Sequence, residues 1–119
     1  MLQPIVHYFL HFIAIAAIAR WYHREKWFRN WLILAATMLV DLDHLLAEPI
    51  FHPMRCSIGF HLLHQEDLAL LYLAGALLLK RSLMKLVLIG LSFHMLTDLI
   101  DCMWMSNECE SCILPSYLG

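Results

Sequence analysis

The stretch from Leu83 to Trp104 reads LMKLVLIGLSFHMLTDLIDCMW, and its interpretation decides the fold. It is long enough to cross a bilayer, because about 20 apolar residues at about 1.5 Å per residue span the hydrocarbon core. Lys85 lies near its start, and further along three ionisable residues follow helical spacing: His94, Asp98 and Asp101. Ionisable side chains inside a membrane helix are costly and mark functional sites by default. The stretch therefore predicts a transmembrane helix with a functional polar stripe.

Three more apolar stretches precede this one, and together they predict an all-α integral membrane bundle of about four transmembrane helices. They run from Ile5 to Arg20, from Phe28 to Leu46, and from Asp67 to Leu79, the last with a start as early as His64 left open. The second and fourth stretches are long enough to span, whereas the first and third are marginal and require local thinning of the bilayer. A soluble bundle is the alternative, and 61% apolar residues against about 45–50% in soluble domains argues against it. At 119 residues we expect a single domain, residues 1–119.

Lys and Arg residues lie mainly in two of the connections, and they orient the predicted bundle. The connections after the first and third stretches carry Arg20, Arg24, Lys26, Arg29, Lys80, Arg81 and Lys85. The connection after the second stretch has only Arg55. Positively charged loops stay in the cytoplasm, so both termini and the connection with Arg55 should face outward. The net charge of −2, with no basic face, gives no support to nucleic-acid binding.

The first stretch contains the small-residue run Ala14-Ile15-Ala16-Ala17, which is similar to a signal-peptide cleavage site. A secretory signal opens with a basic segment, whereas residues 1–4 here carry no Lys or Arg. We therefore expect the first stretch to be a retained helix.

Polar residues follow helical spacing in the first two stretches as well. His7 and His11 are four residues apart and share one helix face. In the second stretch Asp41 and His44 share a face, whereas Asp43 points away unless the helix ends there. Carboxylates at a helix C-terminus oppose the helix dipole, so this end calls for a counter-charge that a cation would supply.

The outward connection contains His61 and His64, whose H-x-x-H spacing lets both imidazoles reach one metal ion. His23 and His52 have no partner at ligand spacing and should be solvated. For each polar group a metal-free alternative is open: solvated side chains, hydrogen bonds at the headgroups, or an inter-helix network. The topology uses only Lys and Arg, yet it brings all the groups to one membrane face, and bundle cores are known places for metal sites.

We therefore predict a divalent metal site at the outer face. The expected ligands are His7, His11, Asp41, Asp43, His44, His61, His64, His94 and Asp98. Asp101 is the expected catalytic base, with Glu66 as the alternative. Mixed imidazole and carboxylate donors suit zinc first, with manganese or iron as alternatives. The set exceeds the needs of one tetrahedral ion, so one or two ions are expected, with one carboxylate bridging two ions and other members orienting the ligating imidazoles.

Four cysteines lie on the predicted outer side, where disulfides persist. Cys56 and Cys102 flank the polar cluster in sequence, and Cys109 and Cys112 form a C-x-x-C in the tail. Of the three possible pairings, we favour Cys56 with Cys102 and Cys109 with Cys112. Thiolate ligation of metal is the alternative. A redox role for the C-x-x-C is disfavoured, because no thioredoxin-like βαβ pattern accompanies it.

Four motifs stand in order along most of the chain: H-x-x-x-H at 7–11, LVDLDH at 39–44, RCSIGFHLLH at 55–64 and HMLTDLIDC at 94–102. With them the chain resembles a family of small bacterial inner-membrane proteins of unknown function. More remotely, it is similar to the LexA-regulated, membrane-bound metal-dependent hydrolases, which show an early His, a D-x-D-H motif, a His-rich loop and an H-x-x-x-D motif. The resemblance implies metal binding, and less directly hydrolysis, in a bacterial inner membrane. The outward side that the Lys and Arg residues predict for both termini would then be the periplasm. Those hydrolases usually carry Arg and Thr beside the loop His pair, whereas Leu62 and Leu63 stand here and leave a substrate-binding role unfilled.

Three functions fit this pattern. The first is metal-dependent hydrolysis of an ester or phosphoester, lipids included, at the membrane surface. The second is metal binding without chemistry, for structure, sensing or transport. The third is haem binding by paired His, which the abundant Asp residues argue against, because haem iron does not use them. We predict the first, with the lipid bilayer and a lipid or small ester substrate as partners.

Overall fold

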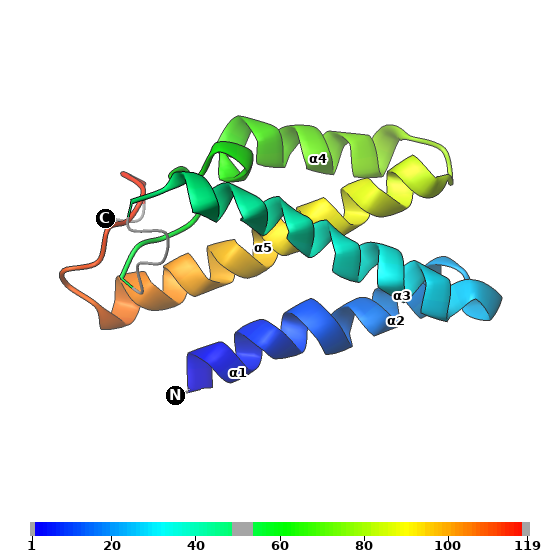
Figure 1. Cartoon of the computed structure of the whole chain (residues 1–119), viewed down its shortest axis with the longest axis horizontal. Coiled ribbons are helices and arrows are strands. Elements are labelled where there is room, and N and C mark those ends of the chain that lie inside the picture. Colours follow the sequence, from blue (N-terminus) through cyan, green and yellow to red (C-terminus); the bar gives the residue numbers. More distant parts are fainter. Residues whose placement is uncertain (1, 49–53, 118–119) are drawn as a thin grey trace.

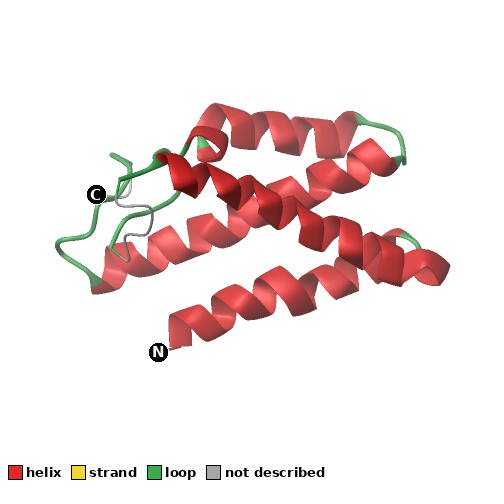
Figure 2. Ribbon diagram, in the orientation of Figure 1, coloured by secondary structure: helices red, strands yellow, loops and turns green. Residues whose placement is uncertain are grey.

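A computed structural model describes residues 2–48 and 54–117, and every regular element in that part of the chain is a helix (Figure 2). The α-helices are α1 (Leu2–Phe9), α2 (Ile15–Tyr22), α3 (Trp27–Ala36), α4 (Glu66–Leu78) and α5 (Leu83–Glu108). The π turn η1 (Leu10–Ala14) joins α1 to α2, and the remaining elements are the 3-10 helices η2 (Arg24–Lys26), η3 (Thr37–Leu46) and η4 (Leu62–His64). The all-α prediction is confirmed, and each predicted stretch corresponds to one helical segment with slightly different ends. His52 lies outside the described residues.

The helices are arranged so that the two basic connections lie at one end of the bundle. In Figure 1 this end is on the right, while the N-terminus, the C-terminal tail and the segment that precedes α4 lie on the left. We call the end with the two basic connections the basic end, and the opposite end, with both termini, the polar end. The hydroxyl of Tyr22, at the end of α2, donates to the Ser82 carbonyl at 2.8 Å and accepts from the Ser82 amide at 2.9 Å. These bonds tie the two basic connections together.

Two small apolar cores hold the helices in place. The first joins α2, α3 and α5 through Ile15, Ala19, Tyr22, Leu34 and Leu86. The second, at the polar end, contains Ile58, Met95 and the disulfide between Cys56 and Cys102. A second disulfide joins Cys109 to Cys112, so the favoured cysteine pairing is confirmed.

The second predicted helix changes its winding halfway, and this corrects one expectation. The chain is α-helical to Ala36 and then 3-10 helical from Thr37 to Leu46. A 3-10 helix has three residues per turn, and the buried residues of η3 are Thr37, Val40 and Asp43, at intervals of three. Asp43 therefore points into the bundle, whereas an α-helix continuing through this position would have pointed it away from the site.

Two helical segments of the described chain are long and apolar enough to cross a membrane: Leu2–Tyr22 and Leu83–Glu108. For the fourth predicted stretch, the expected length and apolar composition of a membrane-spanning helix are thus confirmed. The first stretch was expected to be marginal but qualifies, because α1 and α2 join through η1 into one rod of 21 residues. The second was expected to qualify but does not, since it is divided into α3 and η3, with 10 residues each.

Candidate metal centre

Helix α5 and the 3-10 helix η3 approach each other closely at Gly90. A Cβ atom at Gly90 would lie 2.6 Å from Cγ2 and 2.9 Å from Oγ1 of Thr37, so a larger residue would push the two elements apart. His94 lies four residues beyond Gly90, and Asp41 lies four residues beyond Thr37. The side chains of His94 and Asp41 meet, with 3.1 Å between Nε2 of His94 and Oδ1 of Asp41.

Four side chains from three elements converge next to this contact. They are Asp41 of η3, His64 of η4, and His94 and Asp98 of α5. Nε2 of His64 lies 3.3 Å from Oδ1 of Asp41, 3.2 Å from Nε2 of His94 and 3.1 Å from Oδ2 of Asp98. Nε2 of His94 lies 3.1 and 3.3 Å from the same two oxygens. We call these four residues the tetrad.

The tetrad distances are close to the edges of a coordination tetrahedron. Four ligands about 2.0 Å from a central zinc ion lie about 3.3 Å from one another. Hydrogen bonding alone does not account for the arrangement, because each Nε2 faces three polar atoms with only one proton or one lone pair. Oδ2 of Asp98 is also buried and accepts no well-oriented hydrogen bond. The donors and their geometry therefore fit a divalent cation.

Asp43 holds the opposite side of the His64 ring. Its Oδ2 lies 2.9 Å from Nδ1 of His64 and accepts a 2.7 Å hydrogen bond from the amide of Leu63. A carboxylate on the far nitrogen of a ligating His fixes the ring and its tautomer. Asp43 thus has the position of an orienting residue for the tetrad, not that of one of its four donors.

The charge around His64 is strongly negative. Burial lowers its pKa, but contacts with Asp41, Asp98 and Asp43 outweigh burial and raise the pKa of His64 to about 10. Without metal the ring therefore holds a proton at neutral pH, in the place that a cation would take. Metal binding would release that proton, since a ligating imidazole must be neutral.

His44 and His61 lie beside the tetrad. Their rings stack with centroids 3.7 Å apart, and Nε2 of His44 lies 3.3 Å from Oγ of Ser57. Burial and the neighbouring His44 lower the pKa of His61 to about 4, so this ring is neutral at neutral pH. Asp43, His44 and His64 also bring one donor atom each within 4.8 Å of one another. Metal ligation by His44 and His61 stays a prediction.

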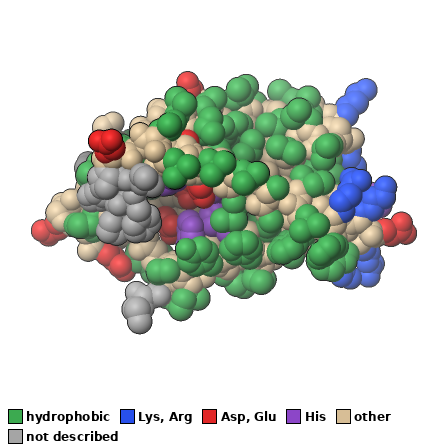
Figure 3. Space-filling view, in the orientation of Figure 1, with side chains coloured by type: hydrophobic (Ala, Val, Ile, Leu, Met, Phe, Trp, Pro, Cys, Tyr) green, Lys and Arg blue, Asp and Glu red, His purple; other side chains and the backbone are tan. Residues whose placement is uncertain are grey.

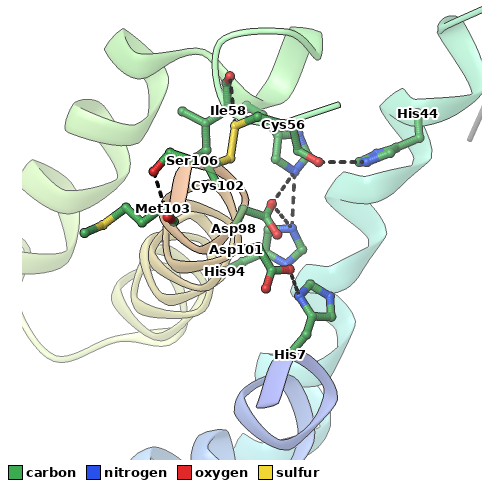
Figure 4. Close-up of a disulfide and its surroundings, with 12 residues drawn as sticks. His7, His44, Cys56, Ile58, His94, Asp98, Asp101, Cys102, Met103 and Ser106 are labelled. Carbon is green, nitrogen blue, oxygen red and sulfur yellow. Dashed lines mark hydrogen bonds and ion pairs between the residues drawn. A yellow bond between two sulfur atoms is a disulfide. The ribbon is translucent and has the colours of Figure 1, made fainter. Parts of the chain in front are cut away.

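The first helix adds His7 and His11 next to His94 and Asp98 of α5. Their ring centroids are 4.4 Å apart, and the His11 ring lies 4.7 Å from that of His94. Nδ1 of His7 lies 2.5 Å from Oδ2 of Asp101, and Figure 4 shows the two side chains pointing toward each other across the gap between α1 and α5. All the predicted ligands and the predicted base therefore gather at the polar end.

A pocket of about 580 Å³ opens over this cluster. Its walls include His7, Asp41, His44, Arg55, Asp98 and Asp101. In Figure 3, His and acidic side chains are recessed between apolar surfaces on one face. Glu66, the alternative base, lines a separate apolar groove between α4 and α5. Of the two candidate bases, Asp101 therefore lines the pocket over the cluster, and Glu66 does not.

Sequence reasoning did not find Arg55 as part of the pocket. Arg55 is 7% exposed, and its guanidinium carbon lies 4.2 Å from the centre of the Phe60 ring. The disulfide from Cys56 to Cys102 anchors the neighbouring residue to α5, one turn beyond Asp98 (Figure 4). The sequence signal that could have assigned Arg55 to the pocket is its position directly before Cys56, at the start of the RCSIGFHLLH motif.

The family comparison covers most of the chain. The model of a family of unknown function (DUF6122) matches residues 1–105, so the chain belongs to that family. This confirms the resemblance to a family of unknown function. No curated protein and no solved structure matches the chain. The remote similarity to the LexA-regulated hydrolases therefore receives no support from the comparisons and stays a prediction.

Proposed function

We propose that this protein is a multi-pass membrane metalloprotein that binds zinc at the tetrad and hydrolyses an ester or phosphoester at the membrane surface. The observation that carries the proposal is the set of five donor distances of 3.1–3.3 Å among Asp41, His64, His94 and Asp98. Manganese and iron are the alternative metals.

The membrane part of the proposal rests on what the helices leave uncovered. Only 17% of the apolar window in Leu2–Tyr22 and 33% of that in Leu83–Glu108 is buried, whereas a core helix of a soluble protein is mostly buried. Leu70, Leu77 and Leu78 of α4 are 68%, 71% and 83% exposed. Lipid tails would cover these apolar side chains without the hydrophobic penalty of exposing them to water.

Two shorter segments would complete the four-span bundle. Helix α3 continues into η3 without a break in helical backbone angles, and about 15 Å of α-helix plus about 20 Å of 3-10 helix would reach across a bilayer core. Helix α4 is about 20 Å long and would require local thinning. The segregated Lys and Arg would place the basic end in the cytoplasm and both termini in the periplasm of a bacterial inner membrane.

Hydrolysis is supported by the pocket beside the tetrad. A bound divalent ion lowers the pKa of a coordinated water and polarises an ester oxygen. Asp101 lines the same pocket and would accept the proton of the attacking water. Arg55 lines it as well and would attract an anionic phosphoester, which fills the role that Leu62 and Leu63 left open.

Metal analysis of the detergent-purified protein tests the proposal first. We expect at least one zinc, manganese or iron ion per chain, and loss of metal when His94→Ala and Asp98→Ala are combined. His23→Ala is the matched control, because His23 is an exposed imidazole at the basic end. An ion-free protein after metal loading would overturn the metal site. With metal bound, a panel of carboxylic and phosphoric esters tests hydrolysis, and no turnover on any of them would refute that part.

A closed metal site is the second candidate function. The tetrad supplies four protein donors, and structural zinc sites are typically four-coordinate without an open position. A metal-binding protein without chemistry would show tightly held zinc and no exchangeable ligand on it.

A further inference from the structure

His11 is a buried imidazole that the tetrad does not use. It is 2% exposed, and its Nε2 is buried without a hydrogen-bond partner. Leaving such a group unpaired costs stability, so each case calls for an explanation. The rings that pack against it are two other imidazoles, those of His7 and His94, and neither they nor a carboxylate form a hydrogen bond with its Nε2.

The local backbone places His11 at this position. Residues 10–14 form a π turn inside an otherwise α-helical rod, and His11 is the buried residue of that turn. Nε1 of Trp31 donates a 2.8 Å hydrogen bond to the carbonyl of Phe12 within the turn. Single π turns inside α-helices occur frequently at functional sites.

One donor atom each of His7, His11 and Asp98 lies within 4.8 Å of the others. Asp98 therefore belongs to two donor groups, this one and the tetrad. We infer that His7, His11 and Asp98 bind a second divalent ion, with Asp98 bridging it to the tetrad ion. This inference rests on the proposed function, because it takes the tetrad ion as given. Ions in two-metal sites are typically about 3.5–4 Å apart.

The two positions differ in how many protein donors they have. The tetrad position has four and is complete as a tetrahedral site, whereas the second position has three. His7, Asp98 and Asp101 line the pocket, so the missing ligand would come from that side. Asp101 holds the ring of His7 by its Nδ1, as carboxylates hold ligating imidazoles elsewhere. The second ion is thus the one with an open position for an oxygen ligand from an ester or phosphoester.

Stoichiometry separates this inference from the proposed function. We expect two ions per wild-type chain, and one per chain when His7→Gln and His11→Gln are combined, with His23→Gln as the control. Two ions in the double variant, or one in both proteins, would overturn the second site and leave the tetrad intact. No ion in the wild type would overturn the tetrad itself.

A spectroscopic test needs no variant and covers the case in which the double variant does not fold. Wild-type protein is loaded with Mn(II) at one and at two equivalents, and its electron paramagnetic resonance is recorded. We expect the signal of isolated ions at one equivalent and a magnetically coupled pair at two. Isolated-ion signals at both loadings would contradict an Asp98 bridge.

Discussion

The two ends of the bundle hold ionisable side chains in opposite physical situations. At the basic end Arg24, Lys26 and Lys80 are exposed and keep their hydration. At the polar end His64 is 0% and Asp98 is 6% exposed, and each contacts several other ionisable groups. A solvated charge contributes little to stability, whereas a buried one depends on its partners. Substitutions should therefore matter at one end and hardly at all at the other.

The largest effect is expected at the carboxylate that both donor groups share. Asp98→Asn should remove metal almost completely and lower the free energy of unfolding by about 3–5 kcal/mol, because it leaves buried partners uncompensated. Asp67→Asn is the control, since Asp67 is exposed at the start of α4. Metal content and thermal unfolding in detergent measure both variants. If both variants lost the same amount of metal and stability, the expected difference between the buried Asp98 and the exposed Asp67 would be wrong.

The disulfides should come next, and they differ from each other. The bond from Cys56 to Cys102 closes a loop with a sequence separation of 46, and that from Cys109 to Cys112 one of 3. Loop-closure entropy predicts a loss of about 2–4 kcal/mol when both Cys56 and Cys102 become Ser, and about 1–2 kcal/mol for the tail pair. Only the first pair should also weaken metal binding, because it anchors the loop with His64. Unfolding curves and metal titrations would show this, and equal losses would refute it.

A smaller effect is expected from the orienting carboxylate. Asp43→Asn keeps the shape of the side chain but weakens its hold on Nδ1 of His64. Metal affinity should fall about 10–100-fold, as for other residues that orient a ligating imidazole. Competition with a chelator of known affinity measures the change. Complete loss of metal would instead make Asp43 a direct ligand.

The smallest effect is expected at the basic end. Arg24→Gln combined with Lys26→Gln should change the free energy of unfolding by less than about 1 kcal/mol, since both side chains are exposed. Metal content should be unchanged. These charges are expected to hold the basic end in the cytoplasm. A cysteine-accessibility or reporter assay of the orientation of the chain in the membrane is therefore the informative measurement. A loss of metal in this variant would show that the two ends are coupled.

The secondary structure was predictable because apolar runs and their breaks are local properties of the chain. The run from Leu83 to Trp104 is contained in α5, and the basic turns fall where Lys and Arg interrupt apolar sequence. The gathering of His and Asp at one end also followed, since antiparallel helices return to the same side after each basic turn. The cysteine pairing was predictable because Cys56 and Cys102 flank the polar cluster in sequence, while Cys109 and Cys112 are only three residues apart.

The role of each polar residue was less accessible. Helical spacing assumes about 3.6 residues per turn, so it left the direction of Asp43 open although Asp43 was expected at the site. The 3-10 helix decides that Asp43 points inward. Arg55 could not be assigned to the pocket, because loop residues carry no periodicity that reports their direction. His7 and His11 were expected on one face, and their ring centroids do lie 4.4 Å apart. The π turn that buries His11 leaves no pattern in the sequence.

The sequence by itself determined that the chain is helical, that its charged residues separate to two ends, and which side chains are available for a metal. Only the tertiary structure decided that the donor atoms of His64 and His94 lie 3.1–3.3 Å from each other and from those of Asp41 and Asp98, while Asp43 contacts the far side of His64. The physical reason is distance along the chain. Spacing constrains neighbours within a few turns, whereas the tetrad depends on contacts such as that of Gly90 with Thr37, which exist only once the helices have packed.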